Sequence, residues 1–205
     1  MADTTAKGRL GRRDLLRGMG GAALLPLLGA CAPSYDELPS PMRPGSRLDS
    51  LMYAIDPHLD ITNAHTNERV NLRFFEGGTY NRRAVQQFDW LFRDWRRNES
   101  PDIDPRIYWG LAAIADAARK QGSSGRMTLL SGFRTKHTND MLRSEGGGVS
   151  SNSYHLRRRA ADFRLDGVPA PEVADYAQWL QVGGVGRYGA GFTHVDTGPI
   201  RTWGG

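Results

Sequence analysis

The stretch Phe192-Thr193-His194-Val195-Asp196-Thr197-Gly198-Pro199-Ile200-Arg201-Thr202-Trp203 lies at the end of the 205-residue chain and decides the fold. Its first five residues predict a β-strand. Residues two apart on a strand face the same side, so His194 and Asp196 are expected to face one cavity. A histidine beside a carboxylate is a candidate metal site, although the pattern His-x-Asp is common by chance when it stands alone.

A second histidine and aspartate stand earlier in the chain, seven residues apart. His155 and Asp162 are separated by Leu-Arg-Arg-Arg-Ala-Ala. If His155 ends a loop and Asp162 enters a strand, both side chains converge on one point. Imidazole nitrogen and carboxylate oxygen bind zinc at about 2.0–2.2 Å. The spacing therefore permits a metal site, and the alternative is a pair of histidines that form structural hydrogen bonds.

The residues around this pair resemble a known family. Ser153-Tyr154-His155, followed by Ala160 and Asp162, resembles the motif Ser-x-His-x-x-Gly-x-Ala-x-Asp of the M15 family of zinc D-Ala-D-Ala peptidases. The wider chain, from about Leu48 to Trp203, resembles the DUF882, or peptidase M15-like, branch of murein endopeptidase K-like zinc peptidases. Besides the stretch quoted first, the matching segments are residues 62–68 (Thr-Asn-Ala-His-Thr-Asn-Glu), 92–96 (Phe-Arg-Asp-Trp-Arg), 131–134 (Ser-Gly-Phe-Arg) with 138–139 (Thr-Asn), and 183–186 (Gly-Gly-Val-Gly).

This resemblance implies a fold, a cofactor and a substrate. The fold is that of the D-Ala-D-Ala peptidases and the hedgehog signalling domain: one α+β domain with a central antiparallel sheet flanked by helices. The cofactor is Zn²⁺, bound by His155, Asp162 and His194, with a fourth position open for an activated water. The substrate is the peptide of peptidoglycan. Whether the bond joins D-Ala to diaminopimelate or two diaminopimelates stays open, as does endopeptidase against carboxypeptidase action.

Two positions depart from the family pattern. Arg158 stands where the motif has glycine, and is either tolerated there or alters the rim of the cleft. Gly191 stands where many relatives have an acidic general base. Asp196 is the nearest acidic alternative for that role, and its other possible role is to orient a ligand histidine. The leading interpretation is a zinc metallopeptidase, and the missing acid is the main support for the alternative, a non-catalytic, zinc-stabilised module that binds peptidoglycan.

Other polar residues are assigned through the same resemblance. Arg134 is expected to contact the substrate, because a guanidinium can bind a carboxylate or polarise a carbonyl; the alternative is a surface salt bridge. Ser153 is expected to form a hydrogen bond in the cleft. His137 is expected to be structural or exposed, and His58 and His65 are not expected to be ligands.

The remaining body is assigned to helices, strands and turns by its pattern. Because helices come first and strands dominate later, the order of elements favours an α+β domain. Strands are predicted at residues 48–63, 68–75, 126–131, 160–165, 183–187 and 192–196. Helices are predicted from Asn81 to about Arg97, from Asp104-Pro105 to about Gln121, and at residues 138–144 and 171–180, with turns or loops at residues 76–79 and 146–148.

The first residues predict export. Arg12-Arg13 precedes a short apolar stretch at residues 19–28, about ten residues where a membrane span needs roughly twenty. The pair resembles the signal for twin-arginine export. Cys31 ends a sequence that resembles a lipobox, which predicts a lipid anchor; the alternative is ordinary cleavage and a soluble product. We therefore expect an export signal over residues 1–31, a flexible tether over 32–46, the peptidase domain over 47–205, and a location in the periplasm or cell envelope.

Composition limits the other functions. The net charge of +5 suits either a solvated surface or an anionic polymer such as the cell wall. The sequence has no zinc finger, RNA-recognition motif or helix-turn-helix pattern, so no nucleic-acid partner is expected. The single cysteine excludes an intramolecular disulfide. We expect a monomer that contacts the membrane only through the export signal or lipid anchor.

Overall fold

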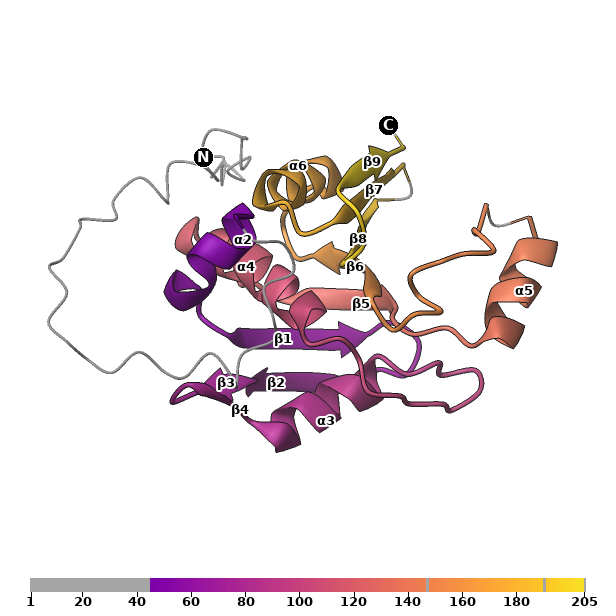
Figure 1. Ribbon diagram of the computed structural model, residues 1–205, viewed down its shortest axis with the longest axis horizontal. Helices are drawn as coiled ribbons and strands as arrows, with labels where there is room; N and C mark the ends of the chain where they lie inside the picture. The colour runs from indigo at the N-terminus through magenta and orange to yellow at the C-terminus, as the bar shows by residue number, and fades with distance from the viewer. Residues whose placement is uncertain (1–44, 147, 190, 205) are drawn as a thin grey trace, which may run out of the picture.

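The computed structural model describes residues 45–146, 148–189 and 191–204 (Figure 1). The predicted export signal, Cys31 and nearly all of the predicted tether lie outside the described residues. The first helix within the described residues is α2 (Arg47–Leu51). Ser46 caps this helix, because its side chain accepts a hydrogen bond of 3.1 Å from the backbone N–H of Asp49.

A seven-stranded sheet forms the centre of the domain, with the strand order β2-β1-β5-β6-β8-β7-β9. Neighbouring strands are antiparallel except for the β1/β5 and β7/β9 pairs, which are parallel. The strands are β1 (His58–Asn63), β2 (Arg69–Arg73), β5 (Met127–Ser131), β6 (Ala160–Leu165), β7 (Gly184–Tyr188), β8 (Phe192–Asp196) and β9 (Arg201–Trp203). A separate hairpin joins β3 (Phe75–Glu76) to β4 (Thr79–Tyr80). The predicted α+β domain with a central sheet flanked by helices is confirmed, and the sheet is mixed rather than wholly antiparallel.

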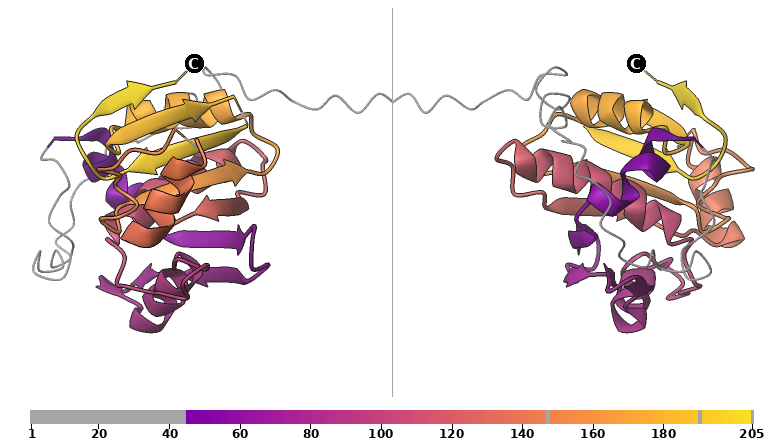
Figure 2. Two further views of the ribbon diagram at one scale, coloured as in Figure 1. Left: turned by 90° about the vertical axis from the view of Figure 1, so that its right-hand side faces the viewer. Right: turned by 60° about the vertical axis from the view of Figure 1, so that its left-hand side comes forward.

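Helices α4 (Arg106–Lys120) and α6 (Ala170–Leu180) cover one face of this sheet, and α2 packs against both helices (Figure 2). Helix α4 is buried from Ile107 to Ala118, which explains why its sequence is apolar on nearly every side. Helix α3 (Arg82–Leu91) packs beside β2. Helix α5 (Lys136–Ser144) lies away from the sheet, at the right of Figure 1.

The alternation of side chains along β6 and β8 separates the core from the opposite face. Ala161, Phe163 and Val195 belong to the hydrophobic core beneath the helices. Because successive residues of a strand point to opposite faces, Asp162 and His194 face away from those helices. The chemically active residues of the two strands therefore lie on the face that the helices leave open.

Two predicted strands need correction. Residues 48–63 are a strand only from His58 onward, because α2 and a 3₁₀ turn at Met52–Ala54 occupy the first part. The predicted strand over 68–75 comprises β2 and the first residue of the hairpin. The sequence reasoning also missed strand β9.

The helix that begins at Asn81 is capped as predicted, since the Asn81 side chain accepts a hydrogen bond from Ala84 N–H at 3.1 Å. It ends at Leu91 rather than near Arg97. Beyond the helix, the backbone N–H of Asp94 donates to the Glu99 carbonyl at 2.9 Å rather than to a carbonyl four residues earlier. Among the described residues, no helix combines the length and apolar character that crossing a membrane requires.

Candidate metal centre

His155, Asp162 and His194 meet on the open face of the sheet. Asp162 on β6 and His194 on β8 are direct cross-strand partners. His155 lies in the turn before β6, and that turn brings its ring back over the strand. All three side chains are buried. Of the residues that the structure describes, these three form the cluster of histidines and carboxylates that can hold a metal ion.

The distances within the cluster suit a single ion. The Nε2 atom of His155 lies 3.2 Å from an Asp162 oxygen and 3.2 Å from Nδ1 of His194. Nδ1 of His194 lies 2.7 Å from the other Asp162 oxygen. Ligands of a tetrahedral zinc ion stand about 3.3 Å apart when each bond is about 2.0–2.1 Å long. Small outward shifts of the Asp162 carboxylate would complete this geometry.

The outer nitrogen of each histidine has its own acceptor. Nδ1 of His155 donates to the backbone carbonyl of Gly132 at 2.5 Å, and Nε2 of His194 donates to Asp196 at 3.0 Å. A carbonyl can only accept, so the His155 proton is on Nδ1 and Nε2 presents its lone pair to the cluster. Burial lowers the pKa of His155, which favours this neutral form. Metal-binding histidines in proteins have the same outer support.

Asp196 is fully buried, and both of its oxygens are occupied. One oxygen accepts from Gly184 N–H at 3.1 Å, Gly198 N–H at 2.8 Å and Arg201 Nη1 at 3.0 Å. The other accepts from His194 at 3.0 Å and Arg201 Nη2 at 2.6 Å. Burial raises the pKa of Asp196, but the hydrogen bonds from His194 and Arg201 outweigh it and hold the pKa well below its usual range. Of the two roles that the sequence leaves open, this saturation favours orientation of His194 over proton transfer.

Arg134 forms a partly buried ion pair beside the cluster. Its Nη2 donates to Asp162 at 2.5 Å and its Nε donates to Ser131 at 2.7 Å. Its backbone N–H donates to the carbonyl of His155 at 3.3 Å. The remaining group, Nη1, has no hydrogen bond to the residues that the structure describes. Arg134 is also a lining residue of the cleft, so a cationic N–H group is available there.

The cluster lies in a cleft of about 550 Å³. One wall is aromatic and comes from β7, β8 and β9: Tyr188, Phe192 and Trp203. The other wall is polar and comes from the loop that precedes His155: Ser150, Asn152 and Ser153. The Ser153 hydroxyl also accepts the backbone N–H of His155 at 3.3 Å. A cleft of this size can enclose a ligand with both apolar and amide groups.

The other histidines lie outside the cluster. His137 is exposed on α5 and does not line the cleft. His58 contacts the Asn71 side chain at 2.7 Å, and His65 stacks on Trp95 with ring centroids 4.7 Å apart.

Arg158 has a backbone φ of +62° and an exposed side chain. This left-handed conformation explains why the family motif has glycine at the position. Because Arg158 is also absent from the lining residues, the structure favours tolerance of arginine over a change in the cleft.

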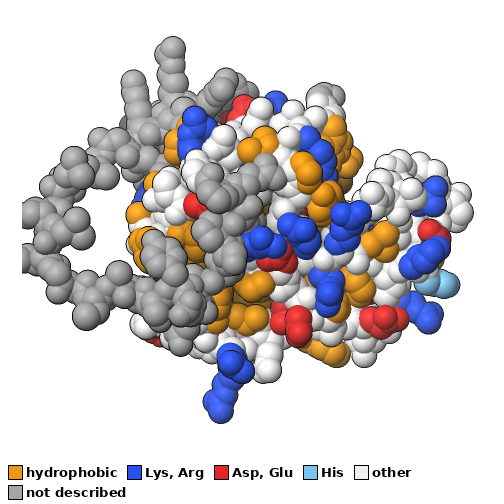
Figure 3. Space-filling view, in the orientation of Figure 1, with side chains coloured by type: hydrophobic (Ala, Val, Ile, Leu, Met, Phe, Trp, Pro, Cys, Tyr) orange, Lys and Arg blue, Asp and Glu red, His pale blue; other side chains and the backbone are white. Residues whose placement is uncertain are grey.

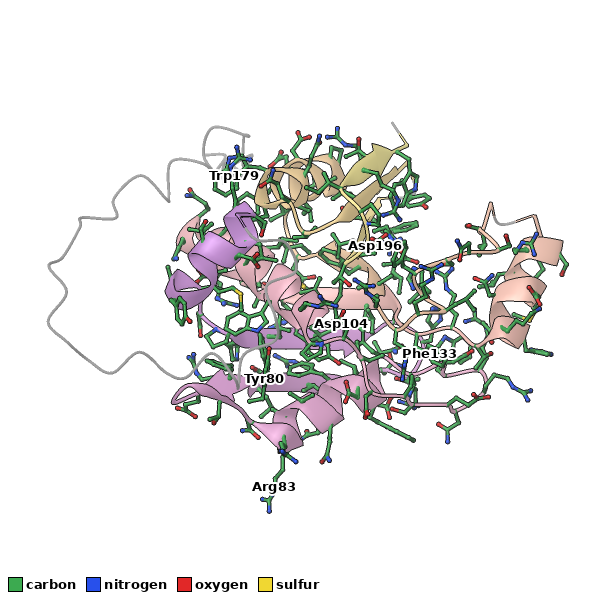
Figure 4. All side chains as sticks on the ribbon, viewed as in Figure 1. Tyr80, Arg83, Asp104, Phe133, Trp179 and Asp196 are labelled. Atoms are coloured by element: carbon green, nitrogen blue, oxygen red, sulfur yellow. The ribbon has the colours of Figure 1, made fainter. Side chains whose placement is uncertain are left out.

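Several supporting residues escaped the sequence reasoning. Arg201 and Trp203 belong to the stretch that carried the family resemblance, but their contacts with Asp196 and His194 were not foreseen. The Gly132 carbonyl gives no signal in a sequence, because every residue has one. Figure 4 labels Asp196, the last residue of strand β8, which is paired with β6.

Comparisons with known proteins identify the family of this chain. The family model described as peptidoglycan L,D-endopeptidase MepK matches residues 53–203. Peptidoglycan L,D-endopeptidase MepK of Escherichia coli (strain K12) is 34% identical over 146 residues, which are 71% of this chain and 79% of that protein. The probable peptidoglycan L,D-endopeptidase MepK of Haemophilus influenzae is 36% identical over 148 residues, 72% of this chain and 78% of that protein. No solved structure gives a significant match. The chain therefore belongs to the MepK family of M15-like peptidases.

Proposed function

We propose that this protein is a zinc-dependent peptidase that hydrolyses L,D amide bonds in the peptide cross-links of peptidoglycan. One observation carries the proposal: two imidazole nitrogens and a carboxylate converge at the base of an open cleft. The names of the related proteins support the substrate and favour a bond between two diaminopimelates over one between D-Ala and diaminopimelate.

Zinc fits the residues that are present. Two nitrogens and one oxygen from three protein ligands are the usual donors of a catalytic zinc site. Both histidines have their outer nitrogens fixed by acceptors, as such a site requires. When bound there, zinc would polarise the scissile carbonyl and lower the pKa of a water molecule towards about 7.

The protein's own groups bind and orient the reactants. Arg134 is held at Nε and Nη2 by Ser131 and Asp162, so its Nη1 has a defined position in the cleft. We propose that Nη1 binds the carbonyl oxygen of the scissile bond and stabilises the negative charge that develops on it. Ser153 would bind the peptide backbone from the polar wall. Asp196 would hold the His194 ring in position.

The amino-terminal residues suggest where the enzyme works. Arg12-Arg13 and the short apolar stretch after them support twin-arginine export to the periplasm or cell envelope. Cys31 would carry a lipid anchor, and residues 32–46 would act as a tether between that anchor and the domain. Such a monomer could reach a fixed polymer while attached to the membrane.

The test is hydrolysis of two defined muropeptide dimers, one joined through two diaminopimelates and one joined through D-Ala and diaminopimelate. Products would be identified by mass spectrometry, with chelator and with zinc added back. We expect cleavage of the first dimer, loss with chelator and recovery with zinc. His194→Ala should abolish cleavage, and His137→Ala is the matched control that should retain it.

A non-catalytic, zinc-stabilised wall-binding module is the alternative. The hydrogen bonds that occupy Asp196 support this alternative, because they leave it poorly suited to act as a general base. Apart from Asp196 and Asp162, no described carboxylate lines the cleft. Binding of muropeptides without products would support the module. Cleavage that persists after complete zinc removal would contradict the proposed zinc dependence.

A further inference from the structure

Arg201 occupies a slot between two aromatic rings at the side of the metal centre. Its guanidinium carbon lies 4.9 Å from the ring centroid of Tyr154 and 4.9 Å from that of Trp203. The Trp203 ring in turn lies 5.1 Å from the His194 ring. Cation–π contacts on both sides fix the plane of the guanidinium.

Three glycines leave room for this slot. A Cβ atom on Gly184 would overlap Arg201 and Asp196, one on Gly198 would overlap the Tyr154 ring, and one on Gly186 would overlap Trp203. None of the three glycines has a positive φ, so their backbone conformation is open to other residues. Space for the slot, rather than backbone conformation, therefore explains why glycine stands at these positions.

The guanidinium faces Asp196 with both amino groups. Nη1 and Nη2 donate to the two carboxylate oxygens at 3.0 and 2.6 Å, and Nη1 also donates to the Pro199 carbonyl at 3.0 Å. The second of those oxygens is the one that accepts Nε2–H of His194. Since both amino groups are already bound, Arg201 has little capacity left to bind a substrate carboxylate, although it lines the cleft.

We propose that Arg201 is a positioning residue of the metal centre, which acts on His194 through Asp196. By fixing the carboxylate, Arg201 fixes the proton on Nε2 of His194 and aims the lone pair of Nδ1 at the metal. The inference rests on the proposed function only in taking His155, Asp162 and His194 as zinc ligands. The inference does not depend on the identity of the substrate or of the bond that is cut.

The test uses the full chain with Arg201→Gln and Arg201→Lys. Arg187 on the neighbouring strand provides the matched control, because it pairs with Asp175 and has a similar exposure, 34% against 38%. The zinc dissociation constant would be measured by competition with a chromophoric chelator. The His194 ring would be followed by ¹⁵N–¹H spectroscopy, and the melting temperature would be measured without metal.

We expect Arg201→Gln to raise the zinc dissociation constant about 10- to 100-fold. The Nε2–H signal of His194 should shift or broaden. Lysine cannot make two parallel hydrogen bonds, so the zinc dissociation constant of Arg201→Lys should lie between that of Arg201→Gln and that of the native protein. Arg187→Gln should leave the zinc affinity and the His194 signal unchanged.

A double-mutant cycle tests whether the effect of Arg201 on zinc binding passes through Asp196. If Arg201 acts only through Asp196, adding Arg201→Gln to Asp196→Asn should change the zinc affinity little further. Unchanged zinc affinity in Arg201→Gln with a raised KM would make Arg201 a substrate-binding residue and overturn the proposal. If the loss of zinc affinity follows the drop in metal-free melting temperature in all variants, the role of Arg201 is purely structural. That result would also overturn the proposal. Failure of muropeptide cleavage by the native protein would contradict the proposed function but leave these metal-binding results interpretable.

Discussion

At the residue scale, the positions of two protons decide what the cleft can bind. The Gly132 carbonyl places one proton on Nδ1 of His155, and the Asp196 carboxylate places another on Nε2 of His194. The opposite nitrogens then meet at Asp162, where a metal ion can bind both. Had either proton been on the inner nitrogen, its N–H would repel a cation instead of binding it.

Arg158 provides a residue-scale prediction about stability. A non-glycine residue at positive φ is strained, so at this position glycine should be better than alanine by about 1 kcal/mol. We expect Arg158→Gly to unfold at higher urea concentration than Arg158→Ala. Both variants lack the guanidinium, so the difference between their stabilities reports the backbone conformation alone.

The neighbouring Arg157 provides the control, because it is exposed and its φ is not positive. There the order should reverse, with Arg157→Ala more stable than Arg157→Gly, since glycine gives the unfolded chain more freedom. Equal stabilities for Gly and Ala at position 158 would contradict the strain assigned to it.

Single residues also show how far the sequence can predict a site. The three candidate ligands follow from motif residues, because ligand chemistry limits which side chains can serve. The hydrogen bond that orients His155 cannot be predicted from the sequence, because its acceptor is a backbone carbonyl. The support of Asp196 comes from Arg201, whose strand was not predicted. It is three residues long and has no buried side chain, so it has no hydrophobic pattern to detect.

At the element scale, the ends of α3 and β5 approach each other closely enough to fix the metal centre. Gly132 follows β5, and a Cβ atom there would overlap the backbone of Phe92 just after α3. The same glycine accepts the hydrogen bond from His155. The closeness of two elements thus determines the position of a candidate ligand.

We therefore expect Gly132→Ala to destabilise the fold by about 1–3 kcal/mol and to weaken zinc binding, because the backbone must move. The control is Gly189→Ala, where a Cβ atom has open space and φ is not positive. Chemical unfolding and chelator competition measure the two effects. Native-like stability and affinity in Gly132→Ala would contradict the close approach.

A second link between elements is sensitive to pH. Asp104 precedes α4 and binds Arg106 at 2.6 Å, Thr197 at 3.2 Å and Arg159 at 3.3 Å, so it joins the helix to the segments around the metal centre. Burial raises the pKa of Asp104, but the hydrogen bonds and charge of Arg106, together with the hydrogen bond from Thr197, outweigh it and lower the pKa below the ordinary 3.8.

A lowered pKa in the folded state stabilises the protein above pH 3.8, and this contribution is lost as the pH falls through the folded pKa. We expect Asp104→Asn to be less stable than the native protein at neutral pH and to lose less stability on acidification. Unfolding free energies measured from pH 7 to pH 3 check this. Parallel curves for the two proteins would contradict it.

Most elements follow from the sequence because they have a clear period or cap. Helix α4 and strand β6 are found nearly where they are predicted, and both contribute mainly to the core. The errors lie where local pattern and tertiary contact disagree. The amphipathic run after Leu91 suggests more helix, but the backbone N–H of Asp94 donates to the Glu99 carbonyl and so leaves the helical pattern.

At the scale of the whole molecule, the sheet brings residues that are distant in the sequence together in one site. His155 and His194 are 39 residues apart in the chain, and the pairing of β6 with β8 brings their rings to a centroid distance of 5.0 Å. The helices cover the other face, so the hydrophobic core and the polar cleft are built on opposite sides of the same strands. The face shown in Figure 3 carries basic and acidic side chains interspersed.

Because the proposed metal joins β6, β8 and the turn before β6, its removal should destabilise the fold. At free zinc about 100 times the dissociation constant, binding contributes about 2.7 kcal/mol, or roughly 5–11 °C in melting temperature. We expect chelator to lower the melting temperature of the native protein by this order. Asp162→Asn should show a much smaller response, and an equal response would contradict a site at Asp162.

The most direct measurement is the anomalous signal of zinc-soaked crystals on the two sides of the zinc absorption edge. We expect one peak at about 2.0–2.2 Å from His155 Nε2, His194 Nδ1 and an Asp162 oxygen, with its fourth side facing the cleft. A peak held by other residues, or none at this cluster when zinc is in excess, would contradict the metal centre.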